Sequence, residues 1–459
     1  MIGRLRHALS WLPVAMLACT RFNPYAGRGD SGTVTHEAGS TSPPEAGVDA
    51  AAHDAAMTCP AMAWGGAASG TSCQTRQLIS IVPHAGAVHS IHLSRVFGDG
   101  VALLYDSTTA TVDTLTLAML DPSTLRVTTS KTLASAPAFD ATALAYDRTG
   151  TLSVAYHAGR GDPVAYIAMD AGLSPANTVN VVSDAGVSAL ALSSVPQNGG
   201  DGGVGPLGLV AGSVGLAWYA APPEVGDFAN SVLHLFARAL PPGLQWTEVE
   251  TYGYTSVSGE LSLHENPQAG VVAAGITNTG QTMVPNALCT WQMAGRQTYC
   301  GFDNTLYGLS LTTESGATHV VYTLEDPETQ ETTLNLATDT DGSYTFPGLA
   351  TIASFPLASP GAPATPRAVM AGGNVTTALA YLQADGRYRL AYVTWHASQS
   401  TATIEDVTTV GSATAKGPPF DAVLEPSGAV TMAIFDATSG SILLARAVPS
   451  SPDAGPSGP

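Results

Sequence analysis

Few residues of this chain are arranged for catalysis or metal binding. No His-Glu-x-x-His zinc motif and no Gly-x-Ser-x-Gly nucleophile elbow occurs in the sequence. The adjacent carboxylates Glu325 and Asp326 could supply the acid and base of a glycosidase, although a solvated loop is the simpler explanation. His89 and His92 would point to opposite faces of a strand, so they would not bind one metal ion together. We therefore expect no metal, no cofactor and no assignable catalytic residue.

The N-terminal residues predict export. A short basic start precedes an apolar run from Ala8 to Ala18, which is too short to span a bilayer and is typical of a signal peptide. The run ends in Met-Leu-Ala-Cys19, which resembles the lipobox of bacterial lipoproteins. The resemblance implies that residues 1–18 are removed and that Cys19 carries a lipid. An ordinary cleavage site is the alternative.

The cysteine count agrees with a lipid on Cys19. The chain has five cysteines, so in an oxidising compartment one of them is left unpaired. If Cys19 is lipidated, the other four form two sequence-local pairs, Cys59–Cys73 and Cys289–Cys300, and both could be disulfides. Neither pair has Cys-x-x-Cys spacing, which argues against a metal site. Another partner for Cys59 stays open.

The charge composition argues against nucleic acid as a partner. Only 12% of residues are charged, the formal net charge is −19, and no basic stripe could bind phosphates. Residues 19–58 and 449–459 are rich in Gly, Ser, Pro and Ala, and they predict a disordered tether and a disordered tail. We expect a monomeric lipoprotein of the cell envelope, in the outer membrane, facing the periplasm or the cell surface.

Seven related repeats fill the chain from Val88 to Val448. Each has an alternating strand, a turn with glycine, a second strand, a polar turn and a third strand, as in the segment Phe139–Asp170. A more variable fourth strand follows, for example Arg126–Leu133 or Thr401–Val410. An alanine late in the third strand would let neighbouring sheets approach closely. The pattern predicts an all-β fold, a seven-bladed β-propeller of four-stranded antiparallel blades.

The last repeat ends at Val448 without a fourth strand, whereas the strand Arg76–Val82 precedes the first repeat. We expect this N-terminal strand to complete the last blade and close the ring, which would hide free strand edges. The propeller would then span residues 77–448, with a disulfide-linked segment at residues 59–76 before it.

The repeats resemble those of bacterial sialidase-like propellers. The segment Gly316–Tyr322, followed by Leu336-Ala-Thr, matches a glycine turn and an apolar-apolar-Tyr strand. The Asp-box of that family is not intact, because the spacing of Asp339 and Gly342 differs. Most arginines of the repeats fall on predicted turns or outer strands, and no arginine trio matches the catalytic set of that family. The resemblance implies that ligands bind on loops at the mouth of the central channel. It places six residues there: Asp106, His157, Tyr219, Phe228, Asp326 and Asp436.

Two functions follow from these patterns. An intact ring without a catalytic set favours a non-enzymatic binding or scaffold propeller for a glycan or a protein, held at the membrane by its lipid. The alternative is a divergent sialidase-like, carbohydrate-active enzyme, which rests on the resemblance alone. A channel mouth without convergent carboxylates or arginines would remove its support.

Overall fold

The described part of this computed structural model comprises the strands between Leu78 and Ala447 and some of the residues that connect them. Between residues 181 and 305, side chains are described only for Ser262. Residues 1–77 and 448–459 lie outside the described residues. The predicted signal peptide, lipidated Cys19, tether, Cys59–Cys73 pair and C-terminal tail all fall there.

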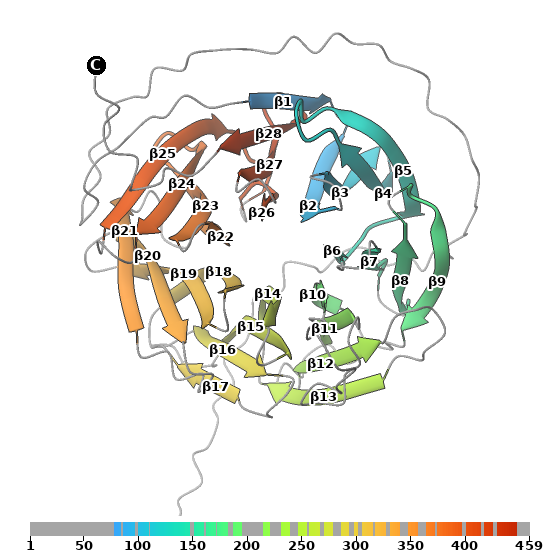
Figure 1. The fold of residues 1–459 in the computed structure, drawn as a ribbon, viewed down its shortest axis with the longest axis horizontal. Helices are drawn as coiled ribbons and strands as arrows, with labels where there is room; N and C mark the ends of the chain where they lie inside the picture. Colours follow the sequence, from blue (N-terminus) through green and yellow to red (C-terminus); the bar gives the residue numbers. More distant parts are fainter. Residues whose placement is uncertain are drawn as a thin grey trace, which may run out of the picture. The chain divides into compact units, whose positions relative to one another are not determined.

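The described residues are all-β, and their 28 strands form seven four-stranded antiparallel sheets (Figure 1). This confirms the predicted all-β fold and the four-stranded antiparallel sheets. No helix occurs among these residues, and so none is found that could cross a membrane. Six sheets follow chain order: β2 (Ala87–Arg95), β3 (Val101–Thr109), β4 (Val112–Leu120), β5 (Val127–Ala136); β6 (Ala141–Tyr146), β7 (Leu152–His157), β8 (Val164–Met169), β9 (Pro175–Val181); β10 (Val187–Ser194), β11 (Val214–Ala220), β12 (Ser231–Arg238), β13 (Thr247–Tyr254); β14 (Val257–Asn266), β15 (Gly270–Asn278), β16 (Asn286–Gln292), β17 (Thr298–Gly301); β18 (Thr305–Glu314), β19 (Ala317–Asp326), β20 (Glu331–Asp339), β21 (Gly348–Pro356); β22 (Thr365–Ala371), β23 (Asn374–Leu382), β24 (Tyr388–His396), β25 (Thr401–Val410).

The remaining sheet joins the two ends of the described chain. Its order is β1 (Leu78–Pro83), β28 (Ser441–Ala447), β27 (Val430–Asp436), β26 (Phe420–Leu424). Strand β1 pairs antiparallel with β28, from Leu78 opposite Arg446 to Pro83 opposite Ser441. The N-terminal strand therefore fills the place that a fourth strand takes in the other sheets.

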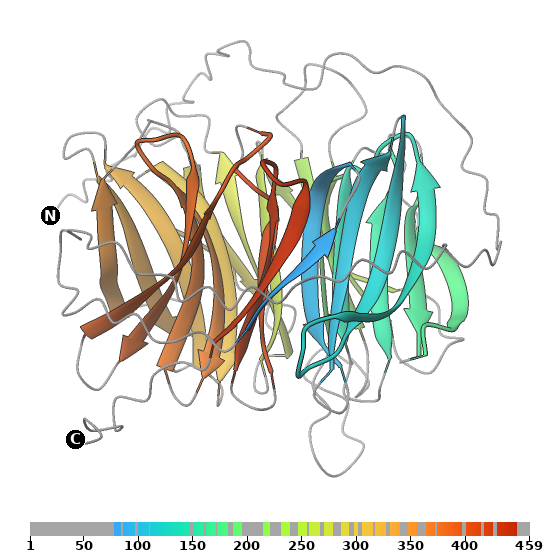
Figure 2. The same ribbon diagram turned by 90° about the horizontal axis from the view of Figure 1, so that it is seen from above.

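The first strand of each sheet contacts the first strand of the next. The contacts run from β2 through β6, β10, β14, β18 and β22 to β26, and β26 in turn contacts β2. In Figure 1 these first strands lie innermost and the fourth strands outermost, and Figure 2 shows the same sheets side by side. We call the seven first strands the inner strands.

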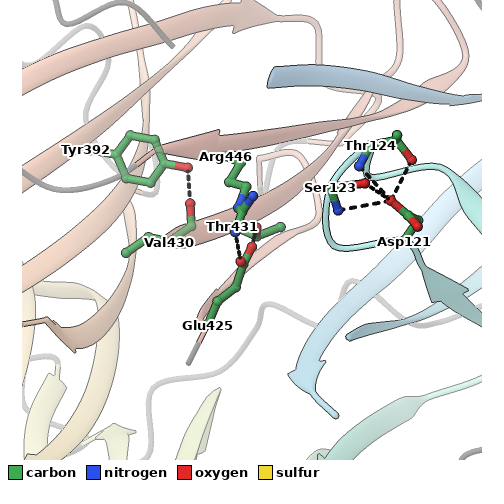
Figure 3. Close-up of polar contacts among 8 residues, drawn as sticks. All are labelled: Asp121, Ser123, Thr124, Tyr392, Glu425, Val430, Thr431 and Arg446. Atoms are coloured by element: carbon green, nitrogen blue, oxygen red, sulfur yellow. Dashed lines mark hydrogen bonds and ion pairs between the residues drawn. The ribbon is translucent and has the colours of Figure 1, made fainter. Parts of the chain in front are cut away.

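Apolar side chains from facing sheets form the core between them. One cluster joins Leu103 of β3 and Ala118 of β4 to Phe435 of β27 and Leu444 of β28. The recurring alanines that are described in the third strands are buried, as expected for close sheet packing: Ala118, Ala168, Ala337 and Ala445. Polar contacts also cross between sheets, since the Tyr392 hydroxyl lies 3.0 Å from the Val430 carbonyl oxygen (Figure 3).

The turn between β4 and β5 is held by one carboxylate. Asp121 Oδ1 accepts hydrogen bonds from the amides of Ser123 (2.9 Å) and Thr124 (2.8 Å) and from both of their hydroxyls (Figure 3). These bonds, that of the Ser123 hydroxyl foremost, lower the pKa of Asp121 to about 2. Leu125 ends the turn at a φ of 53° with its side chain fully buried, so burial offsets the unfavourable left-handed backbone.

The register of β16 and β17 sets Cys289 directly opposite Cys300. Residues opposite each other in an antiparallel pair have Cα atoms about 4.5–5.5 Å apart, a separation that a disulfide can span. The backbone is therefore compatible with the predicted Cys289–Cys300 disulfide, which stays a prediction because these side chains are not described.

Candidate binding site on the inner strands

Each inner strand has one edge without a partner strand, so the amides along that edge need other acceptors. At three of the inner strands, a side chain of the preceding sheet provides such an acceptor. Ser262 Oγ of β14 accepts the Leu311 amide of β18 at 3.3 Å, and Ser310 Oγ of β18 accepts the Ala368 amide of β22 at 2.8 Å. Neighbouring sheets are thus joined by hydrogen bonds as well as by apolar contacts.

A carboxylate makes the same contact between the last sheet and the first. Asp421 Oδ2 of β26 accepts the Leu93 amide of β2 at 2.8 Å, across 328 positions of sequence. Ser262, Ser310 and Asp421 each occupy the same position relative to the second strand of their own sheet, and the other four sheets have a residue at that position too. We call this position in the seven inner strands the inner tier, and from β2 to β26 it reads His92, Ala143, Ala191, Ser262, Ser310, Arg367 and Asp421.

The two charged residues of the inner tier, Arg367 and Asp421, lie on neighbouring sheets. Arg367 of β22 cannot accept an amide, and Asp421 Oδ1 accepts the adjacent Ala422 amide itself at 2.8 Å. Arg367 Nε lies 3.5 Å from Asp421 Oδ1, and its guanidinium lies 5.3 Å from the centre of the Phe420 ring. The side chains of Arg367 and Asp421 are 29% and 18% exposed, so solvent reaches both.

His92 completes this group from β2. Its Nε2 lies 2.9 Å from Thr142 Oγ1 of β6, and Ser90 Oγ lies 2.6 Å from the same hydroxyl. Together with Arg367 and Asp421, these side chains bring a guanidinium, a carboxylate, an imidazole and two hydroxyls onto four neighbouring inner strands. We call these five residues the charged sector.

The electrostatics of the charged sector are close to neutral. Burial, with the positive charge of Arg367 as the second cause, lowers the pKa of His92 to about 4, so the imidazole is uncharged at neutral pH. Burial raises the pKa of Asp421, but Arg367 and the amides of Leu93 and Ala422 act in the opposite direction. One positive and one negative side chain therefore face each other beside a neutral ring.

The lowered pKa of His92 predicts a loss of stability in acid. An unfolded chain takes up the proton at pH 6.5, whereas the folded chain resists it down to about 4. Stability should therefore fall as the pH drops through this window, by roughly 3 kcal/mol from His92. Urea unfolding at pH 7 and pH 4 should show a smaller acid loss for His92→Gln than for the wild type. His89→Gln, at an exposed histidine of the same strand, is the control. Equal acid losses for wild type and His92→Gln would contradict the assignment.

Three of the six residues predicted at the channel mouth have described side chains, and all three are bonded within the fold. Asp106 of β3 is buried and accepts the Ser90 amide; burial raises its pKa. His157 Nδ1, at the end of β7, lies 3.0 Å from Asp140 Oδ2. Asp436 Oδ1, at the end of β27, accepts the Gly411 amide at 2.8 Å. His157 and Asp436 thus hold the ends of their second strands, and Asp106 joins β3 to the inner strand β2.

The side chains of the other three predicted residues lie outside the described part of the structure, and the binding role of all six stays a prediction. Tyr219 lies in β11 and Asp326 ends β19, but neither side chain is described, and Phe228 lies outside the described residues. Among the residues that the structure describes, no group of three or more His, Cys, Asp or Glu side chains is placed to hold a metal ion.

The charged sector is not among the sites that the sequence predicts. The repeat pattern assigns most arginines of the repeats to turns and outer strands, and the spacing of His92 from His89 bears only on shared metal binding. The signal lies in the aligned repeats. One position of the first strand, flanked by apolar residues in six of the seven repeats, carries alanine or serine in four repeats and histidine, arginine and aspartate in the other three.

No protein-family model matches the chain, and no curated protein matches it. Similar solved structures include an α-L-arabinofuranosidase of Fusarium graminearum, with 10% identity over 68% of this chain and 93% of that chain and a TM-score of 0.46. NanB sialidase from Streptococcus pneumoniae has 9% identity over 79% and 67%, with a TM-score of 0.38. Aleuria aurantia lectin has 11% identity over 72% and 98%, with a TM-score of 0.39. At these identities and TM-scores, the similarities assign neither a ligand nor an activity to this chain.

Proposed function

We propose that this protein is a ligand-binding propeller whose charged sector contacts a glycan. The observation that carries the proposal is the make-up of the inner tier. Serine already caps the inner-edge amides from β14 and β18, so packing does not require an arginine, an aspartate and a histidine at the equivalent positions of three adjacent sheets. Partly exposed polar groups that converge from several strands are typical of binding sites.

The proposal includes the finer architecture. We propose that the seven sheets are the blades of one closed propeller and that β1 is its closing strand. The succession of inner-strand contacts supports this, because it returns from β26 to β2. The pairing of β1 with β28 and the bond from Asp421 to the Leu93 amide support it as well.

We also propose that Cys19 carries a lipid that holds the propeller at the cell envelope through residues 20–58. The lipobox-like residues before Cys19 and the odd cysteine count support this. Exchanging Cys19 for serine should move the protein from the membrane fraction to the soluble fraction. Continued membrane association of the Cys19→Ser chain would contradict the anchor and leave the binding proposal unaffected.

Binding can be tested with a variant that keeps the fold. Arg367→Ser introduces the residue that the inner tier already uses at Ser262 and Ser310, and it should weaken glycan binding about tenfold or more. Isothermal titration of the mature protein with purified envelope polysaccharides and their oligosaccharides measures this. Arg387→Ser, on the exposed β23–β24 turn, is the matched control and should bind normally.

The same samples separate binding from catalysis. We expect no new reducing ends after long incubation, because the sector has one arginine paired with an aspartate and no second carboxylate among its described residues. Release of sugar that disappears in Arg367→Ser would make the protein an enzyme. Equal affinity of Arg367→Ser and wild type would refute the charged sector as the binding site.

A further inference from the structure

The charged sector has a charge arrangement that selects among ligands. Arg367 Nε and Asp421 Oδ1 are 3.5 Å apart, and both side chains are partly exposed on the same part of the inner tier. A ligand carboxylate that approached the guanidinium would also approach the Asp421 carboxylate. An ammonium group that approached Asp421 would likewise meet Arg367. For a singly charged ligand, attraction and repulsion therefore largely cancel, while the cost of removing its charge from water remains.

An uncharged ligand with neighbouring hydroxyls avoids this cancellation. A hydroxyl group both donates and accepts, so one hydroxyl can donate to the Asp421 carboxylate while its neighbour accepts from the Arg367 guanidinium. Hydrogen bonds to charged groups are also the stronger ones in proteins. The partly exposed Ser90 hydroxyl adds a further donor and acceptor on β2, and it is held at 2.6 Å by the Thr142 hydroxyl of β6, which is itself buried.

The position of Asp421 fixes the geometry of this pair. Its two oxygens are held by the Leu93 amide of β2 and the Ala422 amide of β26, each at 2.8 Å. The Arg367 guanidinium is held over the Phe420 ring and bonds the Pro366 carbonyl oxygen at 2.9 Å. Both groups are therefore oriented before a ligand arrives, which lowers the entropy lost on binding.

We infer that the charged sector binds a neutral sugar residue through two adjacent hydroxyls, with Asp421 as acceptor and Arg367 as donor. This inference rests on the proposed glycan-binding function and names the class of glycan. Acidic glycans, which carry carboxylates, are the class that it excludes.

Matched ligands test the inference. The mature protein is titrated with two series of oligosaccharides of equal linkage and length, one of neutral hexoses and one of the corresponding uronic acids. We expect the neutral series to bind about tenfold more tightly or better, since the sector offers an anionic ligand no net attraction. Because no ionic attraction is involved, the affinity should change less than about twofold between roughly 50 and 500 mM NaCl.

Two variants test whether the preference for neutral sugars depends on the pair of Arg367 and Asp421. Asp421→Ser keeps a hydroxyl cap like that of Ser310 but leaves Arg367 with its positive charge. It should lose affinity for neutral sugars and gain affinity for uronic acids, reversing the preference. Arg367→Ser should weaken the neutral series without any gain for the acidic one. Thermal melts of both variants establish that the fold is kept.

The outcomes distinguish this inference from the proposed function. Tighter binding of uronic acids by the wild type, or an unchanged preference in Asp421→Ser, would overturn the neutral-sugar inference and leave glycan binding standing. If neither series binds, the inference and the glycan-binding function fail together.

Discussion

Replacing Glu425 with alanine is expected to destabilise the protein by about 3–5 kcal/mol, because it breaks a buried ion pair. The Glu425 side chain lies after β26 and is fully buried, and its carboxylate pairs with Arg446 of β28 (Figure 3). The Thr431 hydroxyl of β27 donates to Glu425 Oε1 at 2.5 Å. Without this carboxylate, an arginine that is only 18% exposed loses its ion pair with Glu425.

Chemical denaturation of wild type and Glu425→Ala measures this loss. The control is the double variant Glu425→Leu/Arg446→Met, which removes both charges and fills the space with apolar side chains. It should recover most of the lost stability, because a buried ion pair adds little over well-packed apolar residues. A loss below about 1 kcal/mol in Glu425→Ala would mean that the pair behaves as an exposed one.

Removing β1 should destabilise the protein even more than the loss of Glu425. Deletion of residues 78–83 exposes the outer edge of β28 and removes Val82, which packs in a cluster with Ile442 and Leu444. With six paired residues in β1 and about 1 kcal/mol for each ladder hydrogen bond, the loss should reach roughly 6 kcal/mol, as much as many domains have in total. We expect loss of the cooperative thermal transition and aggregation through the exposed edge.

A second deletion shows whether the effect belongs to β1. Removing residues 20–58, the predicted tether, should leave the melting temperature unchanged. If the chain without residues 78–83 instead melts like the wild type, the pairing of β1 with β28 does not stabilise the protein.

The sequence predicts the strands better than the contacts between sheets. Alternating apolar residues locate the strands, and the predicted strand Thr401–Val410 has the bounds of β25. Such patterns report which side chains a strand buries, whereas the inner tier depends on bonds between different repeats. The hydrogen bond that the Leu93 amide donates to Asp421 spans 328 positions of sequence, and no local pattern around either residue reveals it.

Local patterns also give no sign of the buried charges. Glu425 follows a strand, where a charged residue ordinarily faces solvent, yet it is 1% exposed. Its partner Arg446 lies in the third strand of its repeat, whereas the repeat pattern assigns most arginines to turns and outer strands. The Glu425–Arg446 pair can be recognised only in the structure, where the register of β27 and β28 sets Arg446 opposite Thr431.

The pairing of β1 with β28 can form only late in the synthesis of the chain. A ribosome makes β1 before any other described strand and makes β28 last, so the two cannot meet until nearly all of the chain exists. Until then the edge that β28 will cover on β1 stays open, and contacts so distant in sequence form slowly. The sheet that contains β1 can therefore be completed only after the ribosome has made β28. A chain that stops early keeps its first strand unpaired and open to proteases.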